Sequence, residues 1–108
     1  MNEVKESKYW KWLFAYKQFE QWDLVEFNEF KRVSFRILQE LDDYIKRRVY
    51  CDWDDLRRPK WNLRYVNHNK NANCSVYFDK QYIIITANET IKKWTELTID
   101  YWDNNIDF

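Results

Sequence analysis

The chain has 108 residues, and its 18 basic and 18 acidic side chains give a formal net charge of zero. Because polyanionic DNA mimics and general nucleic-acid binders depend on a strong net field, this balance argues against both classes. The chain contains no glycine, although 20% of its residues are Trp, Tyr or Phe. Without glycine the P-loop, the dinucleotide-binding fingerprint and the nucleophile elbow are excluded, so we expect a protein that is not an enzyme and that uses no cofactor and no metal.

The first half of the sequence predicts two helices. Apolar residues recur at helical spacing in two stretches, which places the helices at about residues 8–22 and 24–49. The second stretch begins after Asp23, which forms a capping-box pattern with Glu26. Residues 50–60 follow as a charged connector.

The second half predicts three strands and a further helix. Alternating apolar residues bounded by Asn and Asp place strands at about residues 61–67, 74–78 and 82–87. Asn and Asp are expected at the turns because they tolerate the left-handed conformation that glycine would otherwise supply. A helix is expected at about residues 89–103. The alternative is a strand over 94–101 that points Leu97, Ile99 and Tyr101 inward.

These elements predict an α+β fold in a single small domain over residues 1–108, in the order ααβββα. Two N-terminal helices and a C-terminal helix would then pack on a three-stranded antiparallel sheet.

The residues that could carry chemistry are few. His68 is the only histidine, and a pairing with Cys74 or a metal site with Cys51 lacks the spacing typical of either site. Nothing in the chain indicates export, so we expect a cytoplasmic protein in which Cys51 and Cys74 are free thiols. The acidic residues near Trp53 have basic neighbours, which favours a solvated ion-pair network.

A basic and aromatic run offers a candidate contact with nucleic acid. Cations can hold phosphates while rings stack on bases, and this composition occurs at Arg57, Arg58, Lys60, Trp61 and Arg64. Aspartates close to this run cancel much of its field. Nucleic-acid binding by a small regulator is therefore the alternative function.

The main functional expectation comes from the aromatic residues. A domain of this size cannot bury them all, and exposed rings favour association with a protein. The expected partner-binding residues are Trp10, Phe14, Trp22, Trp53, Trp102, Asp100 and Asp103. Together with an AT-biased composition, this predicts an inhibitor from bacterial conflict. Such an inhibitor would be a phage or mobile-element anti-defence protein (for example an anti-CRISPR) or a toxin immunity protein. It would occlude a host defence nuclease complex or a toxin.

Overall fold

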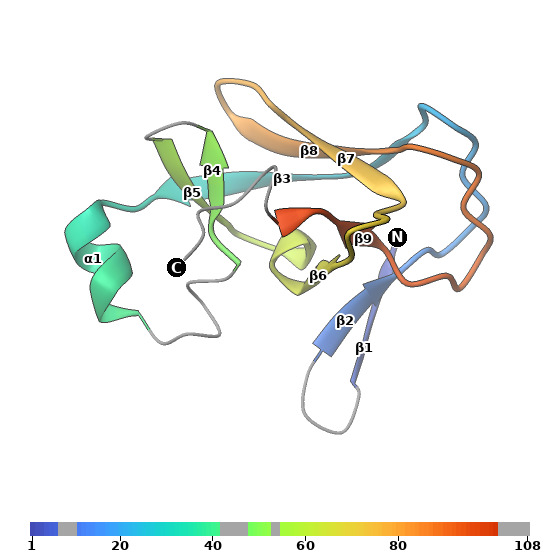
Figure 1. Cartoon of the computed structure of the whole chain (residues 1–108), viewed down its shortest axis with the longest axis horizontal. Helices are drawn as coiled ribbons and strands as arrows, with labels where there is room; N and C mark the ends of the chain where they lie inside the picture. The colour runs from blue at the N-terminus through green and yellow to red at the C-terminus, as the bar shows by residue number, and fades with distance from the viewer. Residues whose placement is uncertain (7–10, 42–47, 53–54, 102–108) are drawn as a thin grey trace.

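The computed structural model describes residues 1–6, 11–41, 48–52 and 55–101, and most of its regular structure is β (Figure 1). The elements are β1 (Glu3–Glu6), β2 (Lys11–Phe14), β3 (Leu24–Arg32), α1 (Phe35–Glu40), β4 (Tyr50–Asp52), β5 (Asp55–Pro59), the 3₁₀ helix η1 (Asn62–Tyr65), β6 (Asn67–His68), β7 (Cys74–Phe78), β8 (Tyr82–Ala87) and β9 (Thr98–Ile99). Within these residues, no helix is long and apolar enough to cross a membrane.

The strands form one larger sheet and two small ones. The larger sheet has the order β4-β5-β3-β8-β7, and its neighbouring strands pair antiparallel. β1 and β2 form a separate antiparallel hairpin, whereas β6 and β9 pair in parallel. Figure 1 shows β3 as the long central strand, with α1 at one end and the β6–β9 pair below β7.

The two predicted N-terminal helices are wrong. The first stretch contains β2, and the second begins with the strand β3, while α1 is the one helix among its described residues 24–41 and 48–49. Asp23 does not cap a helix, because its Oδ2 accepts a hydrogen bond from the backbone N–H of Glu20 at 2.8 Å, within a turn. α1 is instead capped by Ser34, whose hydroxyl oxygen accepts from the backbone N–H of Ile37 at 3.2 Å.

The apolar spacing of β3 led to the prediction of a helix, because apolar and polar residues do not alternate regularly along this strand. Its register with β8 shifts between Leu24 and Glu26, so apolar residues no longer fall on every second position. A bulge of this kind makes a strand resemble a helical pattern. Pairing with strands far along the chain then overrides local helix propensity.

Two strands occur where they were predicted, at Cys74–Phe78 and Tyr82–Ala87, and they form an antiparallel pair. The predicted three-stranded meander is nevertheless wrong. β8 takes β3 as its second neighbour, while the expected strand at 61–67 is mainly the 3₁₀ helix η1.

The predicted C-terminal helix over 89–103 is also wrong, and the strand alternative describes the chain better. Residues 91–97 run antiparallel to residues 13–19, and the backbones of Phe19 and Ile91 exchange two hydrogen bonds of 2.8 Å. Leu97 and Ile99 are fully buried. The left-handed positions differ as well, since the non-glycine residues with positive φ in the described chain are Trp22 and Trp94 rather than Asn or Asp.

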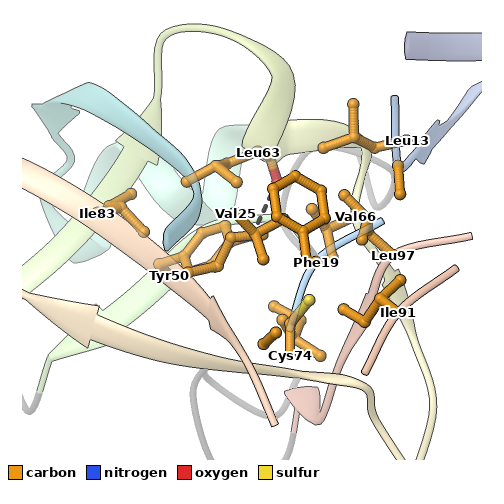
Figure 2. Packing of buried hydrophobic residues seen from close by; sticks show 14 residues of the cluster. Leu13, Phe19, Val25, Tyr50, Leu63, Val66, Cys74, Ile83, Ile91 and Leu97 are labelled. Carbon is orange, nitrogen blue, oxygen red and sulfur yellow. Dashed lines mark hydrogen bonds between the residues drawn. The ribbon is translucent and has the colours of Figure 1, made fainter. Parts of the chain in front are cut away.

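The core joins the larger sheet to residues 13–19, to η1 and to residues 91–99. Figure 2 shows Tyr50 and Phe19 among aliphatic side chains contributed by β2, β3, η1, β8 and the 91–97 segment. The hydroxyl group of Tyr50 donates to the carbonyl oxygen of Leu63 at 2.8 Å, which satisfies its one polar group. Leu38, Val49 and Leu56 form a second buried cluster near α1.

Candidate functional site

The structure brings together two segments that lie about thirty residues apart in the sequence. Residues 66–73, which include β6, lie beside residues 96–101, which include β9. Asn67 pairs with Thr98 and His68 with Ile99. The backbone N–H of Asn69 also donates to the carbonyl oxygen of Ile99 at 3.1 Å. We call these two segments the β6–β9 junction.

Asn73 ties the junction together through both ends of its side-chain amide. Its Nδ2 donates to the carbonyl oxygen of Glu96 at 2.9 Å, and its Oδ1 accepts from the backbone N–H of Thr98, also at 2.9 Å. The backbone N–H of Asn73 in turn donates to the Thr98 hydroxyl at 3.1 Å. Three short polar contacts thus fix the course of the chain through the junction.

His68 is held against the last described residues of the chain. Its Nδ1 accepts a hydrogen bond from the backbone N–H of Tyr101 at 3.0 Å and lies 3.9 Å from a carboxylate oxygen of Asp100. In a neutral imidazole an accepting Nδ1 leaves the proton on Nε2. The ring of His68 lies 5.1 Å from that of Tyr101, so the two side chains form one aromatic and polar pair.

The hydroxyl group of Tyr101 points to the backbone just before β6. The hydroxyl donates to the carbonyl oxygen of Val66 at 2.6 Å, and the ring packs against the main core cluster. Two electron-rich oxygen atoms therefore meet at this point. Complete burial is the main cause of the raised pKa of Tyr50, and the nearby Tyr101 adds to it.

A polar cleft of about 390 Å³ adjoins the junction. Its lining includes Lys70, Asn71, Ser75, Asn88 and Asp100. Asp100 thus belongs to the cleft and also lies beside His68. A volume of this size is within the range of small-molecule sites, and the cleft offers both a cation and an anion.

Cys74 also lines the cleft, but its thiol is not a ready nucleophile. Burial raises its pKa to about 12, so the reactive thiolate is scarce near neutral pH. A Cys-His pairing, which the spacing in the sequence already disfavoured, therefore has no support from the chemistry of Cys74 either. Among the described residues, no three His, Cys, Asp or Glu side chains are placed to hold a metal ion.

The predicted partner-binding residues do not gather in the structure. Trp10, Trp53, Trp102 and Asp103 lie outside the described residues. Phe14 is half-buried in β2 with the ammonium of Lys5 5.2 Å from its ring, and Trp22 is exposed in a turn. Of the three members that the structure describes, Asp100 is the one that lies in the junction.

The predicted nucleic-acid contacts are mostly engaged within the protein. The guanidinium group of Arg57 is buried and bonds Asp55 at 2.9 Å, with the Phe30 ring 4.2 Å away. Lys60 pairs with Glu29 at 3.7 Å. Arg64 donates to the carbonyl oxygens of Trp61 and Lys60, and Arg58 lies half-buried in β5. Only Trp61, which is half-exposed, presents most of a large side chain to solvent.

Sequence reasoning missed Val66, Asn73 and Tyr101 as site residues. The one signal for Tyr101 was the alternating pattern of 94–101, which points Tyr101 inward if the segment is extended. The sequence offered nothing to join that pattern to His68, because their contact depends on a parallel pairing between segments about thirty residues apart.

The model of the SET domain matches residues 3–102, which include every described strand and the whole junction. The chain belongs to the SET domain family. A search of curated proteins found no match for it.

Two solved structures show the same fold as this SET domain. A candidate histone methyltransferase of Plasmodium falciparum is 14% identical with a TM-score of 0.74, and the match covers 94% of this chain and 96% of that one. A humanized mutant of the Chaetomium thermophilum Polycomb Repressive Complex 2, bound to an inhibitor, is 18% identical with a TM-score of 0.76. That match covers 99% of this chain but only 15% of the other.

Membership of the SET family corrects the functional expectation. The family match and the methyltransferase neighbours show that four expectations are wrong. These are the α+β fold, the anti-defence or immunity inhibitor, the nucleic-acid-binding alternative and the absence of enzymatic function. Nothing supports a host defence nuclease or a toxin as partner. The lack of glycine excluded only folds that depend on glycine-rich loops, and the β6–β9 junction is built from Asn, His, Thr and Tyr.

Proposed function

We propose that this SET domain is a methyltransferase that methylates an amine side chain of a protein, with lysine as the acceptor class. The observation that carries the proposal is the β6–β9 junction within the family match, where the Tyr101 hydroxyl and the Val66 carbonyl oxygen meet 2.6 Å apart. The Plasmodium falciparum structure bears on the same chemistry, since it is of a candidate histone methyltransferase.

S-adenosylmethionine, when bound, supplies a methyl group carried on a positively charged sulfur. The residues of the cleft fit such a donor, because the donor's amino-acid part carries a carboxylate and an ammonium. Lys70 and Asp100 offer the opposite charges in the same cleft, and Asn71 and Asn88 add neutral amides. These four side chains are our candidates for holding the donor.

The chain's own residues would act by orientation and electrostatics. The oxygen atoms of Tyr101 and Val66 carry partial negative charge, and they favour positive charge that develops on an amine nearby. Because the Tyr101 proton is engaged by Val66, the phenolic lone pairs face outward from that bond. His68 keeps Tyr101 in place through the bond from the Tyr101 backbone N–H.

The amine must lose a proton before its lone pair can attack a methyl group. Asp100, half-buried beside the His68 ring, is a carboxylate within the junction that could receive a proton directly or through water. We assign Asp100 this role and Tyr101 the role of orienting the acceptor.

A protein is therefore also the proposed partner of this chain. The Chaetomium thermophilum structure is of a complex, and this chain spans only 15% of the chain that it matches there. A stable protein partner in addition to the substrate follows from that likeness as a proposal.

The test is transfer of a labelled methyl group. Purified protein is incubated with S-adenosylmethionine that carries a tritiated methyl group and with core histones, and the methylated residue is located by mass spectrometry. We expect Tyr101→Phe to lower kcat by about a hundredfold, because it removes one oxygen that faces the developing charge. Tyr82→Phe, in β8 and outside the junction, is the matched control and should keep kcat. Loss of activity to the same extent in both variants would contradict the assignment of Tyr101.

A further inference from the structure

A second concave surface lies away from the β6–β9 junction, between the start of β3 and the loop before η1. It is a groove of about 610 Å³, lined mainly by apolar atoms. The large side chains along it are Tyr16, Leu24, Phe27 and Trp61, and each is at least one-third exposed. We call it the Trp61 groove. None of its lining residues is shared with the cleft beside Asp100.

The Trp61 groove contains one acidic side chain, Glu26, which is half-buried. Its carboxylate accepts a hydrogen bond from Nδ2 of Asn2 at 3.2 Å. Burial raises the pKa of Glu26, while the amides of Asn2 and Asn62 and the ammonium group of Met1 act to lower it. The carboxylate has thus lost part of its water, and a positive group already lies near it.

Aromatic rings next to a desolvated carboxylate select a particular kind of cation. A ring face attracts positive charge, and the attraction grows when water is excluded. A bare ammonium is strongly hydrated and loses much by entering an apolar groove. An ammonium that carries methyl groups has less hydration to lose and also gains contact with Leu24 and the rings. One ring that lines the groove already has a cation near it, since the ammonium of Lys17 lies 5.7 Å from the Tyr16 ring.

We propose that the Trp61 groove binds the side chain of a methylated lysine presented by a protein, with Glu26 facing the charge and Trp61 packing on the methyl groups. The choice of methyl-lysine over other alkylated ammonium ions rests on the proposed function, since methyl-lysine is the class of product which that reaction makes. The site is separate from the junction, so the chain would read a mark at one place and write it at another.

Binding is tested by calorimetry on the whole chain with peptides and without a methyl donor, so the outcome does not depend on catalysis. The probes are one peptide with trimethyllysine, the same peptide with unmodified lysine, and the same peptide with an uncharged tert-butyl isostere. We expect the trimethyllysine peptide to bind at least about fivefold more tightly than either of the others. Equal binding of the isostere would show a merely hydrophobic groove and overturn the proposal. Equal binding of unmodified lysine would overturn it too.

Variants locate the binding. Trp61→Leu and Glu26→Gln should each weaken binding of the trimethyllysine peptide about fivefold or more. Their matched controls are Trp22→Leu, an exposed tryptophan outside the groove, and Glu29→Gln on the same strand, and both should bind as the parent does. Trp61 is exposed, so its loss should leave the fold intact even if Glu26→Gln weakens it.

Two further measurements decide whether the ligand is a side chain of a protein or a free small cation. In the NMR spectrum, the indole N–H signal that disappears in Trp61→Leu should be the one that shifts when the trimethyllysine peptide is added. Tetramethylammonium and choline should bind more weakly than the peptide. If choline binds as tightly as the peptide, the groove takes a free small cation and the proposal is wrong. If methyl transfer fails while the peptide still binds, the proposed function alone is contradicted.

Discussion

Trp22 has φ of 75°, in the left-handed region that favours glycine, and its side chain is 66% exposed. Its backbone N–H donates to the carbonyl oxygen of Ala87 at 2.8 Å, which holds the turn in this conformation. A non-glycine residue in the left-handed region costs about 1–2 kcal/mol. We therefore expect Trp22→Gly to be more stable than Trp22→Ala by about 1 kcal/mol, since both variants lose the same exposed ring. Urea unfolding of the pair measures the difference, and equal stability would show that this turn is not strained.

The burial of Cys74 makes the stability of the protein depend on pH. Burial raises its pKa from 9.0 to about 12, so the folded state favours the neutral thiol. The contribution of Cys74 to the free energy of unfolding is therefore fully present below pH 9 and is lost as the pH rises from about 9 towards 12. The free energy of unfolding should fall by at most about 1.4 kcal/mol per pH unit in that range.

The control for this prediction is Cys74→Ala, which removes the titrating group but leaves Tyr50, whose pKa is also raised by burial. The variant should show a shallower fall of stability with pH than the parent. Identical slopes in the two proteins would mean that the Cys74 thiol is not protected by the fold. Labelling with iodoacetamide at pH 7.5 should agree, with Cys74 reacting only after unfolding.

At the scale of elements, Asn73 is the residue that connects the two strands of the junction. Asn73→Ala removes the acceptor for the Thr98 N–H and the donor to the Glu96 carbonyl. Leaving these two part-buried backbone groups without partners costs about 1–3 kcal/mol each, so we expect a loss of about 2–6 kcal/mol. Asn71→Ala, at an exposed position in the same loop, should cost under 1 kcal/mol.

Amide hydrogen exchange shows where in the structure Asn73→Ala lowers stability. In Asn73→Ala the amides of Thr98 and Tyr101 should exchange faster than the rest of the sheet, because β9 is only two residues long and has few other bonds. If protection falls evenly over β3, β7 and β8 instead, Asn73 acts on the whole fold and not on the junction.

The sequence was informative where pairing is local and misleading where it is distant. The hairpin of β7 and β8 was predicted with its bounds, because two alternating runs flank a short Asp-Lys turn. β3 was mistaken for a helix, because it takes its partners β5 and β8 from far along the chain and carries a bulge. The site shows the same limit. His68 and Asp100 were both noticed, but their contact depends on a parallel pairing that no local pattern reveals.

At the scale of the whole molecule, the fold places two surfaces with different chemistry on one chain. The junction offers charges, amides and two converging oxygen atoms, whereas the Trp61 groove offers rings and a single carboxylate. Mixed charges that sum to zero leave no strong overall field. Selection of substrate must therefore come from these local surfaces and not from long-range attraction.

A titration of the isotopically labelled chain with S-adenosylhomocysteine, followed by backbone NMR, tests whether the β6–β9 junction and its cleft are the methyl-transfer site that we propose. We expect saturable shifts concentrated at Lys70, Asn71, Asp100 and Tyr101, with little change in α1 (Phe35–Glu40). No saturable shift, or shifts confined to residues outside the junction and its cleft, would contradict it.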